Sequence, residues 1–98
     1  MIVDLASPNH DARDTRVDML ILHYTGMQSA KAAIDRLRDP AAEVSAHYVV
    51  DEDGTIFNMV PEDRRAWHAG ISSWRGHKAL NARSIGIEIV NQIGRAHV

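Results

Sequence analysis

His23 and Glu88 have the residue types and the surroundings that chemistry near neutral pH requires. His23 is the polar exception in an apolar run, MLILHY, that ends at Thr25 and Gly26. Burying a histidine costs free energy unless a partner binds it, and sheet proteins place their sites where strands end. His23 is therefore a candidate ligand or proton carrier. The alternative is a structural histidine that hydrogen-bonds to a backbone carbonyl.

Glu88 lies within the equally apolar segment SIGIEIV, residues 84–90. The three isoleucines of this segment share one face of the predicted strand, and Glu88 lies on the other face. Burial raises the pKa of a carboxyl group and so prepares it to act as an acid or base near neutrality. The alternative is an edge strand from which Glu88 faces water.

Composition places the chain among soluble globular proteins with one small domain. Its 98 residues are 45% apolar and 24% charged, and the net charge of -2 indicates neither nucleic acid nor an anionic membrane as a partner. The absence of cysteine excludes disulfides and thiolate zinc sites within the chain. No run has the length of a membrane helix or of a signal-peptide core, so we expect a protein that stays where it is made.

The elements that must position His23 and Glu88 form an α/β pattern. An amphipathic helix is predicted from Ser29, as N-cap, to Arg38, and it is expected to pack on the sheet without contributing chemistry. The other predictions, in chain order, are a polar leader over 1–17, a buried central strand over 17–24, a hairpin of strands 46–50 and 55–60 around Asp53-Gly54, an irregular loop over 61–83 and a central strand over 84–90.

Aromatic and basic side chains gather on the predicted loop, which indicates a binding surface. They include Trp67, His68 and Trp74. The alternative is that the tryptophans fix the loop to the core. Elsewhere, Arg13 and Arg16 are expected to be solvated, and His47 is expected to be a packed, hydrogen-bonded sheet residue.

Four motifs in one order make the sequence similar to a known enzyme family. They are ILHYTG, then SAHYVVDEDGTI, then AWHAG followed by SSWRG, and finally NARSIGIEIVN. The sequence resembles the zinc-dependent N-acetylmuramoyl-L-alanine amidases, a group that includes bacterial cell-wall-recycling amidases, phage amidases and animal peptidoglycan recognition proteins. The resemblance covers roughly residues 5 to 91, and the order of the motifs makes it specific.

The resemblance implies a mixed central β-sheet with helices packed on it. It implies hydrolysis of the amide that joins the lactyl group of N-acetylmuramic acid to L-alanine, with Zn²⁺ as cofactor and peptidoglycan or muropeptide fragments as partners. His23 matches the family's first zinc ligand, and Glu88 matches the acid that activates or orients the attacking water. The residues expected to bind substrate are Trp67, His68, Trp74 and Asn81.

The end of the chain departs from the family pattern. The family's second histidine ligand and its Asp or Cys ligand follow beyond the Glu88 strand, and QIGRAHV resembles neither. We therefore expect residues 1–91 to be the N-terminal part of one amidase-like domain, and residues 92–98 to be a non-family tail. A single histidine holds zinc weakly, because a catalytic zinc takes three protein ligands. Exposed apolar surface, marginal stability and aggregation are also expected.

Two alternatives to an amidase stay open. One is a non-catalytic peptidoglycan-binding module, whose groove would use Trp67, His68, Trp74 and Arg75. The other is an inactive α/β fragment in which every polar residue has a structural role. The N-terminus favours the cytoplasm, although the family also works in the periplasm and outside the cell.

Overall fold

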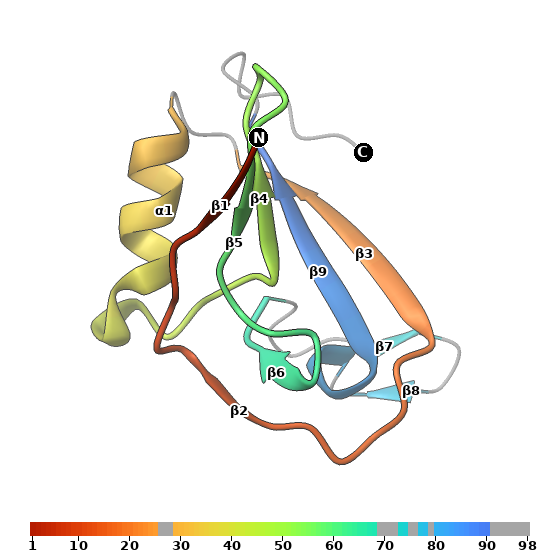
Figure 1. Ribbon diagram of the computed structural model, residues 1–98. Coiled ribbons are helices and arrows are strands. Elements are labelled where there is room, and N and C mark those ends of the chain that lie inside the picture. The colour runs from red at the N-terminus through yellow and green to blue at the C-terminus, as the bar shows by residue number, and fades with distance from the viewer. Residues whose placement is uncertain (26–28, 69–72, 75–76, 79, 91–98) are drawn as a thin grey trace.

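The computed structural model describes residues 1–25, 29–68, 73–74, 77–78 and 80–90. Its centre is a five-stranded sheet in the order β1-β5-β4-β9-β3, with β3 at the outer edge (Figure 1). The strands are β1 (Ile2–Asp4), β5 (Ile56–Asn58), β4 (Tyr48–Val50), β9 (Ser84–Ile89) and β3 (Met19–Tyr24). Only β4 and β5 pair antiparallel, so the sheet is mixed, which confirms the predicted fold class.

Of the two strands that carry the candidate residues, both expected to be central, one is central and the other lies at the edge of the sheet. β9 lies between β4 and β3, so it is a central strand, and the edge-strand alternative for Glu88 is excluded. The prediction that β3 is central was wrong, because in the described part of the chain it pairs with β9 alone. Leu20 is 63% exposed and Leu22 55% exposed, so the outer face of β3 is open.

The helix prediction is confirmed by α1 (Ala30–Arg38). The Ser29 hydroxyl accepts a hydrogen bond from the Ala32 amide at 3.2 Å, as an N-cap does, and the helix ends before Pro40, where η1 (Pro40–Ala42) begins. The apolar stripe is buried and packs on the sheet; the core cluster includes Ala30, Ile34, Leu37, Ala46, Val49, Met59 and Val90. No helix in the described ranges is long and apolar enough to cross a membrane.

The hairpin is also confirmed, with shorter strands than predicted. β4 and β5 pair antiparallel around a turn in which Gly54 has a φ of +89°, a backbone conformation that residues with a side chain rarely adopt. The Asp53 carboxylate accepts a hydrogen bond from the Thr55 amide at 2.9 Å.

The polar leader and the irregular loop were wrong predictions, because both contain short strands. The leader adds β1 to the sheet and pairs β2 (His10–Ala12) antiparallel with β6 (Arg64–Ala66). The loop region also holds β7 (Ser73–Trp74), β8 (His77–Lys78) and η2 (Leu80–Arg83). Strands of two or three residues are too short to show an alternating pattern, and the partners of β1 and β2 lie far away in the chain.

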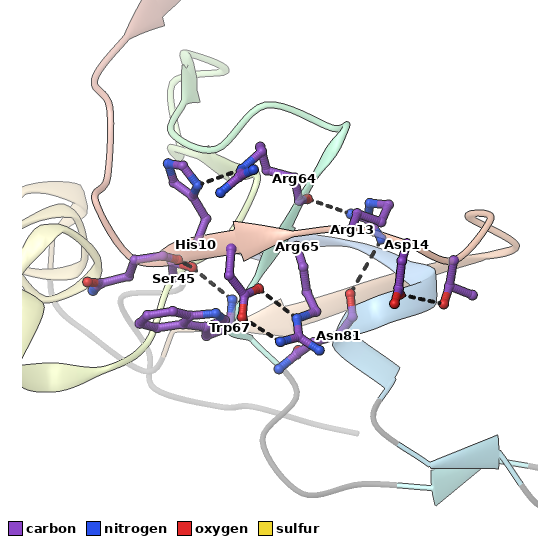
Figure 2. A network of polar contacts seen from close by, with 11 residues as sticks. His10, Arg13, Asp14, Ser45, Arg64, Arg65, Trp67 and Asn81 are labelled. Atoms are coloured by element: carbon purple, nitrogen blue, oxygen red, sulfur yellow. Dashed lines mark hydrogen bonds and ion pairs between the residues drawn. The ribbon is translucent and has the colours of Figure 1, made fainter.

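Arg13 is half-buried and hydrogen-bonded to the protein, which contradicts the expectation that it is simply solvated. Its guanidinium donates hydrogen bonds to the backbone carbonyls of Glu62, Arg64, Asn81, Ala82 and Ser84 at 2.8 to 3.4 Å. Figure 2 shows Arg13 between Arg64 and Asn81 in this network. Burial lowers the pKa of Arg13. Arg16 is exposed, as expected.

Candidate active site

His23 and Glu88 are direct neighbours in the parallel pair of β3 and β9, so their side chains lie on the same sheet face. Both line a cavity of about 250 Å³ between this face, α1 and the segments around β6. The other lining residues are Tyr24, Thr25, Ala33, Arg36, Leu37, Val44, Ser45, Trp67 and His68. The sheet thus brings together the two residues that the sequence singled out for chemistry.

Burial raises the pKa of the Glu88 carboxyl, and the nearby charges of His23 and Arg36 oppose this rise in part. A carboxyl with a raised pKa can exchange protons near neutrality. Helix α1, expected to contribute no chemistry, adds one charged residue, Arg36, to the lining of the cavity.

His68 contacts His23 directly. Its Nδ1 atom lies 3.0 Å from Nε2 of His23, and the two rings meet edge to face with centroids 5.2 Å apart. Burial, together with the charges of His23, His47 and Arg13, lowers the pKa of His68 to about 3, so the ring is neutral at physiological pH. The imidazole lies against Gly86, where an added Cβ would come within 2.4 Å of its Cγ atom.

Two polar residues hold His68 from the other side. The Ser84 hydroxyl lies 2.9 Å from Nε2 of His68 and donates to the Leu80 carbonyl at 2.7 Å, and the Asn81 side-chain oxygen accepts from the His68 amide at 3.0 Å. Ser84 is fully buried and its proton is committed to a carbonyl, so the Ser84–His68 pair is not a nucleophile and its base. No pattern in the sequence indicated these contacts.

The remaining residues expected to bind substrate are placed only in part. Trp67 lines the cavity beside His68, and its backbone is fixed by Ser45, whose hydroxyl accepts from the Trp67 amide at 2.8 Å. Asn81 is not among the residues that line this cavity, and its side-chain oxygen instead positions His68. Trp74 belongs to β7, but its side chain lies outside the described part of the structure.

His47 is fully buried, and its ring centroid lies 6.1 Å from that of His68. Its Nδ1 atom accepts from the Gly86 amide at 3.0 Å, which leaves Nε2 to donate to the Arg64 carbonyl at 2.9 Å. Burial lowers the pKa of His47. The prediction that His47 is a packed, hydrogen-bonded residue is confirmed.

The described residues include no group of three His, Cys, Asp or Glu side chains that could hold a metal ion. A catalytic zinc takes three protein ligands and keeps one position open. This part of the chain therefore supplies an incomplete ligand set, with His23 as one possible donor, and a catalytic zinc does not fit it alone.

Comparison with known proteins decides the family. The profile of the N-acetylmuramoyl-L-alanine amidases matches residues 13–97. The chain belongs to this family. It is 40% identical over 84 residues to N-acetylmuramoyl-L-alanine amidase AmiD of Escherichia coli, covering 79% of this chain and 29% of AmiD. It is 37% identical to 1,6-anhydro-N-acetylmuramyl-L-alanine amidase AmpD of Citrobacter freundii, covering 85% of this chain and 54% of AmpD.

Solved amidase structures have the same fold as this family member. A crystal structure of AmpD superposes with a TM-score of 0.81 at 33% identity and covers 92% of this chain and 61% of that one. AmiD of E. coli, in complex with anhydro-N-acetylmuramic acid-L-Ala-D-γ-Glu-L-Lys, gives a TM-score of 0.68 at 36% identity and covers 89% of this chain and 38% of that one. The chain thus spans about half the length of AmpD and less of AmiD.

Proposed function

We propose that this chain takes part in hydrolysis of the amide between N-acetylmuramic acid and L-alanine of peptidoglycan stem peptides. The observation that carries the proposal is the placement of His23 and Glu88 side by side at one cavity. Membership in the amidase family supports it, because the two residues occupy the motifs ILHYTG and SIGIEIV that suggested this family from the sequence.

In this proposal Glu88 moves the proton. Hydrolysis of an amide requires a water that loses a proton and a leaving nitrogen that gains one. A carboxylate whose pKa is raised by burial can accept the proton from water and deliver it to the amine. Arg36, which also lines the cavity, stabilises the ionised form of Glu88 through its charge.

The proposed substrate is a muropeptide fragment, since an anhydromuramyl peptide occupies the related AmiD structure. Trp67 and His68 are proposed to bind it, because they line the cavity beside His23 and Glu88. Trp74 and Asn81 stay predicted binding residues. Location in the cytoplasm also stays a prediction.

Zinc is part of the proposal only through His23. A bound zinc would polarise the carbonyl and lower the pKa of its water to about 7. His23 is the proposed ligand from this part of the chain, and further ligands would have to come from outside the described residues. Zinc content measured after dialysis, in the wild type and in His23→Ala, tests this assignment.

The test of the proposed reaction is release of stem peptide from an anhydromuramyl peptide by the chain, followed by chromatography. Glu88→Gln is expected to lower the rate at least about 100-fold, the usual cost of losing a general acid–base group. Glu52→Gln, an exposed glutamate in the hairpin turn, is the matched control and should leave the rate unchanged. Absence of turnover by the wild type would contradict the proposal.

A second function, binding without cleavage, is favoured by the incomplete metal ligand set. Isothermal titration with the same muropeptide distinguishes the two functions. Binding that persists in Glu88→Gln without any turnover in the wild type would indicate a binding module.

A further inference from the structure

A continuous chain of hydrogen bonds leads from a backbone carbonyl to the candidate active site. The Leu80 carbonyl lies 2.7 Å from the Ser84 hydroxyl, which lies 2.9 Å from Nε2 of His68. Nδ1 of His68 then lies 3.0 Å from Nε2 of His23. The first members are buried: Ser84 is fully buried and Leu80 is 7% exposed.

The direction of each bond follows from the number of protons available. A carbonyl only accepts, so the single hydroxyl proton of Ser84 must point to Leu80. The Ser84 oxygen can then only accept, and Nε2 of His68 must carry a proton. A neutral imidazole has one N–H, so Nδ1 of His68 is an acceptor, and Nε2 of His23 must donate to it.

We infer that the Leu80 carbonyl, Ser84 and His68 together fix His23 in the tautomer that carries its proton on Nε2. The basic lone pair of His23 is thereby assigned to Nδ1, and no hydrogen bond to this atom is found among the described residues. His68 and Ser84 are then positioning residues, which act on the site through His23. The inference concerns the site of the proposed hydrolysis and rests on that function for its importance.

Two features keep His68 in the position that this role requires. The Asn81 side-chain oxygen holds the His68 amide at 3.0 Å, and Gly86 leaves room for the ring against β9. The second ring nitrogen of a ligating histidine is commonly fixed by such a hydrogen bond, which selects the atom that faces an electrophile. Any electrophile that binds His23, whether a proton or a metal cation, is therefore expected to do so at Nδ1.

The tautomer is measured directly by ¹⁵N NMR of the histidine-labelled 98-residue chain without substrate or metal. His23 should show a pyrrole-type shift at Nε2 and a pyridine-type shift at Nδ1, with its signals assigned by their loss in His23→Gln. A proton on Nδ1 of His23 in the wild type would overturn the inference.

Ser84→Ala tests the origin of the preference. Without the acceptor at Ser84, the proton of His68 is free to move to Nδ1, so His23 should change to a mixture of tautomers. Ser84→Thr keeps the hydroxyl and should preserve the wild-type pattern. An unchanged His23 spectrum in Ser84→Ala would overturn the relay, and the wild-type spectrum still decides the tautomer if a variant does not fold.

This experiment is independent of the hydrolysis assay. A chain with the expected tautomer but no turnover would contradict the proposed function and support the present inference. A chain that cleaves the muropeptide but carries the His23 proton on Nδ1 would support the proposed function and contradict the present inference.

Discussion

At the scale of single residues, the contact between Gly86 and His68 determines the shape of the site. The His68 ring lies so close to β9 that a Cβ at position 86 would approach its Cγ, Cδ2 and Nδ1 atoms to 2.4–2.6 Å. The Gly86 amide also donates to His47, so the strand cannot easily move away. Only glycine leaves enough space here for the His68 ring, so the position of the ring that contacts His23 depends on Gly86.

Gly86→Ala is therefore expected to displace the His68 ring and to lower the free energy of unfolding by about 1–3 kcal/mol, the usual cost of overpacking. Chemical denaturation measures the stability, and the NMR signals of His23 report the displaced ring. A variant with wild-type stability and unchanged His23 signals would show that position 86 has room for a methyl group and would contradict this role of Gly86.

Residue type and immediate context were enough to single out His23 and Glu88 as candidate site residues, and the structure places them side by side at one cavity. Each is a polar exception in an apolar strand, and this exception is visible in the sequence. The contacts of His68 with His23 and Ser84 were not predictable, because they join residues 45 and 16 positions apart. No local pattern records which side chains meet across such distances.

At the scale of the elements, Arg13 joins segments that share no sheet. Its guanidinium binds carbonyls before β6, within β6, in η2 and at the start of β9. These segments carry Asn81 and Ser84, and His68 follows directly after β6 and Trp67. Arg13 thus fixes the position of the elements that support the hydrogen-bond chain to His23.

Arg13→Lys is expected to lower the free energy of unfolding by about 2 kcal/mol or more, because an ammonium group cannot reach several carbonyls in one plane and leaves some of them unsatisfied. Arg16→Lys is the matched control, since Arg16 is exposed, and it should change stability by no more than about 0.5 kcal/mol. Urea denaturation compares the two. Equal effects would mean that the Arg13 carbonyl contacts contribute little to stability.

The elements differ in how far they could be predicted. Helix α1 and the hairpin follow from local signals, which are the Ser29 cap, the apolar stripe and Asp53-Gly54. β2 and β6 are each three residues long and pair across more than fifty residues, so neither showed a period. β3 was misplaced because a strand with apolar side chains on both faces reads as central even at the edge of a sheet.

At the scale of the whole molecule, buried histidines make the fold sensitive to acid. The pKa of His47 is lowered by burial, so between its folded value and the ordinary value of about 6.5 only the unfolded chain binds the proton. His68 acts in the same sense. Stability should therefore be constant above about pH 7 and should fall as the pH decreases below 6.5.

The expected slope is up to about 1.4 kcal/mol per pH unit for each buried histidine. Glu88 opposes it, because a carboxyl with a raised pKa binds its proton more readily in the folded state. Glu88→Gln removes that opposition, so denaturation between pH 7 and 5 should show a steeper loss in this variant than in the wild type. A stability that rises on acidification in Glu88→Gln would contradict the assignment of buried, neutral histidines.

The sheet face opposite α1 determines how the whole molecule behaves in solution. Leu20 and Leu22 of β3 are 63% and 55% exposed, and register places them beside Ile85 and Ile87 of β9. Contiguous apolar surface of this kind promotes association.

The double change Leu20→Lys with Leu22→Lys should therefore reduce self-association in sedimentation velocity. It should leave the free energy of unfolding within about 1 kcal/mol of the wild-type value, since both side chains already face water. Leu37→Ala, at a core position that is 6% exposed, is the control and should instead cost about 2–5 kcal/mol of stability. A wild-type chain that sediments as a monomer at every concentration would show that this face does not associate, and would also contradict the aggregation expected from the sequence.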